Sequence, residues 1–120
     1  MQADIKFMLR IYKTYDLDWM GDEIKDVKCL TKHHIQKREK NGANEIYNYA
    51  LLTPRSHQLL HYLEDNNYGA YCALNDLFRE LNFSIAPPTA EYYEKVKKIL
   101  RVVKKQIKNR DRKRRKTRSR

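Results

Sequence analysis

All four histidines of this chain fall in one short segment, between Leu30 and Leu63. His33 and His34 are adjacent, and His57 precedes His61 by four residues. On a helix, side chains four residues apart project from the same face, so His57 and His61 could share one divalent metal ion. A single histidine, or one His-x-x-x-His pair, is common without a metal. Four imidazoles gathered in one segment instead predict a metal site.

The segment that carries these histidines has the pattern of strand, loop, strand and helix. Residues 28–35 and 47–52 alternate apolar or β-branched residues with polar ones, which favours two short strands. Asn41-Gly42 indicates a turn between them. Thr53 is a suitable N-cap and Pro54 suits the first helical position, so a helix that carries His57 and His61 is expected to begin there.

The first predicted strand ends at the two adjacent histidines. If the hairpin folds back over the helix, His33 could supply a third metal ligand. His34 points to the other side of the strand, so it need not bind the metal. An imidazole beside a metal, with an ordinary pKa near 6.5, is suited to take a proton from water.

The order of these residues, with Asn48 between the two histidine pairs, resembles the HNH (ββα-metal) endonucleases. The His33-His34-Ile35 triplet and the intervals from Asn48 to His57 and from His57 to His61 carry the resemblance. It is most similar to the nuclease domains of DNase colicins and to small HNH proteins of bacteria and phages. The similarity covers Leu30 to Leu63, within an expected core motif of residues 28–65.

The resemblance implies a metal-dependent endonuclease that hydrolyses DNA phosphodiester bonds. By that resemblance His34 is the general base, and His33, His57 and His61 hold one divalent metal ion. Asn48 would brace the loop carrying His34 through a side-chain hydrogen bond to backbone, without touching the substrate. A cytoplasmic protein encoded by a bacterium or a phage is expected.

The chain departs from many relatives in ways that bear on the metal. Many carry CxxC pairs that bind a structural zinc, whereas this chain has only Cys29 and Cys72, so no structural zinc is expected. Many have Asp in place of His33, and the last position is not always His, so His61 either binds the metal or contacts phosphate. Three imidazoles favour Zn²⁺ or Ni²⁺ in binding strength, but Mg²⁺ or Mn²⁺ could be the working ion in cells.

The rest of the chain predicts flanking helices around this motif. Apolar residues recur at helical spacing in residues 4–15, 70–81 and 90–109, and Trp19 is expected to anchor a loop over residues 16–26. The last helix could pack on the core or pair with a second copy. A length of 120 residues predicts one domain, residues 1–109, of α+β class and mostly helical. The sequence predicts neither a transmembrane span nor a signal peptide, and unpaired cysteines favour a reducing compartment.

Positive charge is concentrated at the C-terminal end. Residues 104–120 hold eleven Lys or Arg and one acid, so they carry +10 of the formal net charge of +11. Residues 110–120 are expected to form a disordered basic tail that attracts nucleic acid, although a solvated tail or a nuclear-localisation signal has the same composition. The residues expected to contact phosphate are Lys32, Lys37, Arg38 and Arg55 near the motif, and Arg110, Arg112, Lys113, Arg114, Arg115 and Lys116 in the tail.

Two other functions compete with a DNA endonuclease. The first is a non-catalytic nucleic-acid-binding module in which the metal only stabilises a small domain. The second is an assembly protein whose tail binds RNA or an acidic partner. RNA also remains open as the substrate of a nuclease, and the sequence indicates no base preference.

Overall fold

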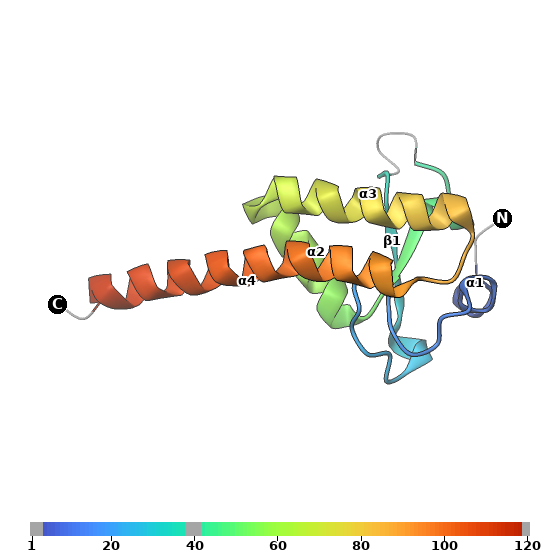
Figure 1. The fold of residues 1–120 in the computed structure, drawn as a ribbon, viewed down its shortest axis with the longest axis horizontal. Helices are drawn as coiled ribbons and strands as arrows, with labels where there is room; N and C mark the ends of the chain where they lie inside the picture. The colour runs from blue at the N-terminus through green and yellow to red at the C-terminus, as the bar shows by residue number, and fades with distance from the viewer. Residues whose placement is uncertain (1–3, 38–41, 119–120) are drawn as a thin grey trace.

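A two-stranded hairpin and four helices make up the described part of the chain (Figure 1). The structure, a computed structural model, describes residues 4–37 and 42–118, with side chains up to Arg110. The class is α+β and mostly helical, as predicted. The elements in order are α1 (Ile5–Tyr12), β1 (Thr31–His34), β2 (Tyr49–Leu52), α2 (Pro54–Asn66), α3 (Tyr68–Ser84) and α4 (Ala90–Arg118).

Antiparallel pairing of β1 with β2 fixes which side chains share each face of the hairpin. Thr31 pairs with Leu52 and His33 with Ala50, while His34 pairs with Tyr49. Because successive side chains alternate across a strand, Thr31 and His33 share one face and His34 lies on the other with Tyr49. The hairpin therefore presents its two adjacent histidines on opposite faces.

Both strands are shorter than the sequence predicts, because a 3₁₀ turn precedes each one. Val27–Cys29 forms the first turn, where the Asp26 side chain accepts a hydrogen bond from the Lys28 N–H at 3.0 Å. Ile46–Asn48 forms the second turn. At the first turn the Cys29 N–H donates to the Asp26 carbonyl at 3.0 Å, and at the second the Asn48 N–H donates to the Glu45 carbonyl at 2.9 Å.

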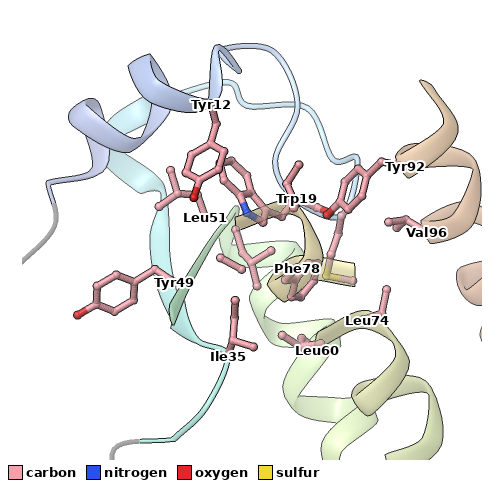
Figure 2. Packing of buried hydrophobic residues seen from close by; sticks show 14 of the residues in the cluster. Tyr12, Trp19, Ile35, Tyr49, Leu51, Leu60, Leu74, Phe78, Tyr92 and Val96 are labelled. Atoms are coloured by element: carbon pink, nitrogen blue, oxygen red, sulfur yellow. The ribbon is translucent and has the colours of Figure 1, made fainter. Parts of the chain in front are cut away.

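The loop between α1 and the first 3₁₀ turn is fixed by buried side chains, as expected for Trp19 (Figure 2). The Trp19 indole is fully buried against the Tyr12 ring at 5.2 Å and donates to Asn82 Oδ1 at 3.1 Å. Asp18, also fully buried, accepts from the backbone N–H groups of Met20 and Thr53 at 2.9 Å each. Asp18 thus ties this loop to the start of α2 and has a structural role.

Helix α2 begins as the sequence predicts. The Thr53 side chain accepts from the Ser56 N–H at 3.2 Å, and Pro54 is the first helical residue. A single residue, Asn67, separates α2 from α3 and caps α3 by accepting from the Ala70 N–H at 3.2 Å. Helix α3 therefore begins at Tyr68, two residues before the helical pattern that the sequence shows over residues 70–81.

Helix α4 packs along α3 and buries Tyr92, Val96 and Val103, and its C-terminal half projects beyond the body of the molecule (Figure 1). It continues to Arg118, into the segment for which the sequence predicts a disordered tail from Arg110. Lys and Arg are good helix formers, and neither Gly nor Pro interrupts residues 90–118, so the helix has no stop signal at residue 110. None of the helices in residues 4–37 and 42–118 is long and apolar enough to cross a membrane.

Candidate metal centre

Three of the four histidines converge between the hairpin and α2. One ligand atom from each of His33, His57 and His61 lies within 4.8 Å of the other two. The His57 and His61 rings are stacked with centroids 4.7 Å apart, and the His33 ring lies edge-on to them at 5.7 and 6.0 Å. Strand β1 supplies His33, and successive turns of α2 supply the other two. The structure thus brings together the three residues predicted to hold a metal.

The three imidazoles form a gradient from the core to the surface. His33 is buried, with its ring edge-on to Tyr71 and Phe78, whereas His57 is half-buried and His61 is exposed. A metal bound by this set would be held from the protein side and open on the side of His61. Catalytic metal sites typically have three protein ligands and one open position, whereas structural zinc sites use four protein ligands.

The orientation of His57 follows from its hydrogen bond with Thr31. Thr31 Oγ1 lies 2.6 Å from His57 Nδ1 and 3.1 Å from the Leu52 carbonyl oxygen. A carbonyl can only accept, so the single hydroxyl proton of Thr31 goes to Leu52 and Nδ1–H of His57 donates to Thr31. This tautomer leaves the lone pair of Nε2 available to a metal.

The other two histidines have partners of the same kind. His61 Nδ1 lies 3.4 Å from a carboxylate oxygen of Glu64, which also forms an ion pair with Lys37. His33 Nε2 lies 3.0 Å from Oδ1 of Asn75, a buried residue of α3. Metal-binding histidines in proteins usually donate their second ring nitrogen to such an acceptor, which fixes the ring and its tautomer. Each of the three rings thus has such a partner on one nitrogen, which leaves its other nitrogen as a candidate metal ligand.

Burial also favours the uncharged forms of His33 and His57. Burial lowers the pKa of His33 to about 4. The hydrogen bond with Asn75 acts to raise this pKa, and the neighbouring His57 and His61 act to lower it further. Burial is also the main cause that lowers the pKa of His57, and the neighbouring His61 is the second cause. Only a neutral imidazole has a lone pair for a metal, so both residues are ready to bind one at neutral pH. The donor set therefore fits a late first-row divalent ion, in which imidazole nitrogen is a favoured ligand.

His34 lies apart from this cluster, on the opposite face of β1. Its ring is 4.8 Å from the Tyr49 ring, and its Nε2 is 2.9 Å from Asn44 Oδ1. The Tyr49 hydroxyl donates to the same Oδ1 at 3.1 Å. Because that oxygen only accepts, His34 must carry its proton on Nε2, which leaves Nδ1 as a proton acceptor. This arrangement orients the half-buried imidazole that the sequence predicts as the general base.

Asn48 fastens the loop that follows His34. Its Oδ1 accepts from the Gln36 N–H at 2.8 Å, and its Nδ2 donates to the carbonyl oxygens of Gln36 at 2.9 Å and Ala43 at 2.8 Å. The two ends of the loop are thus joined through one buried side chain. The resemblance implies this bracing role for Asn48. The three hydrogen bonds that its side chain makes here are all to backbone groups.

The predicted phosphate-binding cations whose side chains the structure describes lie at separate places on the molecule. Lys32 Nζ lies 4.9 Å from the centre of the Tyr49 ring, on the face of His34. Lys37 is paired with Glu64, and Arg55 is exposed in the first turn of α2. Arg110 is exposed on the projecting part of α4. The other predicted cations lie outside the described side chains: Arg38, Arg112, Lys113, Arg114, Arg115 and Lys116.

Four residues of the site were absent from the sequence interpretation: Thr31, Asn44, Glu64 and Asn75. Two of them carry a sequence signal, since Thr31 lies two residues before His33 on a strand and Glu64 lies three residues after His61 on a helix. Asn75 comes from α3, far along the chain, and Asn44 comes from an irregular loop. No periodic pattern points to either of these two.

Searches of protein families, of curated proteins and of solved structures find no match to this chain. The function is therefore argued from the geometry of the site and from the motif that the site contains.

Proposed function

We propose that this protein is a metal-dependent endonuclease of the HNH (ββα-metal) type that hydrolyses DNA phosphodiester bonds. The observation that carries the proposal is the convergence of His33, His57 and His61, whose ligand atoms lie within 4.8 Å of one another. The hairpin followed by a helix that holds them is the arrangement expected of this family. The fixed tautomer of His34 and the loop brace of Asn48 are the two other features that the proposal requires.

In the proposed reaction His33, His57 and His61 would hold a divalent metal ion, which would supply positive charge to offset the charge on the scissile phosphate and the leaving oxygen. His34 accepts a proton from the attacking water at Nδ1, while Asn44 and Tyr49 keep Nε2–H directed away from that water. An in-line displacement brings the water in opposite the leaving oxygen.

Basic residues supply the attraction to DNA in this proposal. Lys32 next to His33 and Arg55 at the start of α2 are the described candidates near the site, and α4 carries the main positive charge. Such a charge releases counterions when it contacts phosphates and gives affinity without base specificity. With two free cysteines, Cys29 and Cys72, we place the protein in a bacterial cytoplasm, encoded by the bacterium or a phage.

The open side of the histidine cluster favours this function over a binding module with a structural metal. In residues 4–37 and 42–118 the cluster contains three His, Cys, Asp or Glu donors, not the four of a structural zinc site. The test is incubation of purified protein with supercoiled plasmid, with a chelator or with added Mg²⁺, Mn²⁺, Zn²⁺ or Ni²⁺. We expect nicked or linear DNA only with metal. Binding of plasmid without cleavage in every metal would contradict the proposal.

A further inference from the structure

A cavity of about 310 Å³ opens between the chain that follows β1 and one face of α3. Gln36 and Lys37 line one wall, and Glu64 lies at the end of α2. Tyr68, Asn75 and Arg79 line the α3 wall, where their spacing places them along one helical face. The volume is at the lower end of the range of about 300–1,000 Å³ that small-ligand pockets occupy.

This cavity shares its walls with the three-histidine cluster. Asn75, which lines it, is hydrogen-bonded to His33 at 3.0 Å, and Glu64 lies 3.4 Å from His61. Tyr71, a further lining residue, places its ring edge-on to the His33 ring at 6.1 Å. The cavity and the histidine cluster therefore share Asn75 and Glu64 as neighbours.

Two stacked tyrosines provide an aromatic surface in this cavity. The Tyr68 and Tyr71 rings lie 5.6 Å apart, inclined by 25°. Tyr71 is 5% exposed and fixed in the core, whereas Tyr68 is 59% exposed. An exposed ring supported by a buried one presents a flat surface, and flat aromatic surfaces of this kind bind unpaired nucleobases by stacking.

The charges around the cavity cancel in pairs. Lys37 pairs with Glu64, and Arg79 lies 3.4 Å from Asp76. Unlike α4, the cavity therefore has no excess of positive charge to select a phosphate. Its aromatic surface and the amide side chains of Gln36 and Asn75 instead suit an uncharged heteroaromatic ring with hydrogen-bonding edges.

We propose that this cavity takes an unpaired nucleobase from the nucleotide next to the cut phosphate, stacked on Tyr68. The inference rests on the proposed function for its position beside the scissile bond. A base inside a duplex is stacked on both faces, so only a single-stranded or flipped nucleotide can enter the cavity. The favoured substrate is therefore DNA with unpaired nucleotides at the cleavage site.

The test compares single-stranded with duplex DNA of the same sequence at about 0.15 M salt, where contacts with exposed cations are partly screened. Fluorescence anisotropy gives the affinity of wild type, Tyr68→Phe and Tyr68→Ala, with Tyr15→Ala as a control for loss of a tyrosine that is 57% exposed elsewhere. Loss of one base–aromatic stack costs about 1–3 kcal/mol, or roughly 5- to 150-fold in affinity. We expect that loss for Tyr68→Ala on single strands alone, with Tyr68→Phe and Tyr15→Ala near wild type.

A 2-aminopurine base in the single strand gives a second reading, because stacking quenches its fluorescence. We expect quenching by wild type and Tyr68→Phe and none by Tyr68→Ala. A wild type that cuts plasmid while Tyr68→Ala leaves single-strand affinity and quenching unchanged would overturn the base site and leave the nuclease standing. A wild type that binds single strands through Tyr68 yet cuts nothing would overturn the nuclease and leave the base site standing.

Discussion

Acid should destabilise the metal-free protein through His33. Its imidazole is 4% exposed, and burial lowers its pKa to about 4, against about 6.5 in an unfolded chain. Between these two values the unfolded state binds a proton that the folded state does not, so the free energy of unfolding falls as pH falls. A pKa difference of about 2.5, at about 1.36 kcal/mol for each pKa unit, corresponds to about 3 kcal/mol. The loss begins near pH 6.5 and is complete near pH 4.

Urea unfolding in the presence of a chelator measures this loss when wild type is compared with His33→Gln between pH 7 and pH 4. The variant has no titrating group at this position, while His57, whose pKa is also lowered, titrates in both proteins. We expect the wild type to lose about 3 kcal/mol more than the variant over that range. Parallel pH dependences for the two proteins would refute the reasoning, because they would show that His33 is not held neutral by burial.

Three further predictions concern the metal, the base and the C-terminal helix. Zn²⁺ or Ni²⁺ should bind in calorimetry with one ion per chain, and Thr31→Val, which removes the hydroxyl partner of His57, should weaken binding by about 10- to 100-fold. His57→Ala binding as tightly as wild type would count against the ligand set. Asn44→Leu should lower kcat by roughly 10-fold or more and leave metal affinity unchanged, because Asn44 is hydrogen-bonded to His34 and Tyr49 and not to a proposed metal ligand. A kcat equal to that of wild type would show that Asn44 does not set the tautomer of His34. Truncation before Arg110 removes eight basic residues, so the log–log dependence of DNA affinity on salt should flatten, by up to about 7 if all eight contact duplex phosphates. An unchanged slope would show that this segment does not bind DNA.

The sequence predicts the elements of this site because their signals are local. Thr53 and Pro54 mark the start of α2 within the chain itself, and the four-residue interval places His57 and His61 on one face of that helix. Successive side chains alternate along a strand, so the strand pattern also places His33 and His34 on opposite faces of β1. Periodicity and capping depend on neighbours in sequence, so they can be read without the fold.

Partners that come from distant or irregular segments could not be predicted in this way. Asn75 reaches His33 only because α3 packs across the hairpin and α2. Asn44 reaches His34 because Asn48 joins the two ends of the intervening loop. Asn48 does so by bonding to backbone carbonyls, which every residue has, so the sequence does not reveal these partners. The sequence overestimates the lengths of the strands because local hydrogen bonds form a 3₁₀ turn before each one, at Val27–Cys29 and at Ile46–Asn48. Such contacts depend on tertiary packing, which propensity does not encode.

The central claim is that the histidines divide into a metal-binding set and a separate base, and His34→Ala tests it most directly. The same preparation is measured twice, for divalent-metal affinity by calorimetry and for the rate of metal-dependent plasmid cleavage at saturating DNA. The account predicts unchanged metal and DNA affinity with cleavage slower by roughly 10²- to 10⁴-fold, the usual contribution of a general base. Cleavage by His34→Ala at the wild-type rate, or loss of metal binding together with cleavage, would contradict that division of roles.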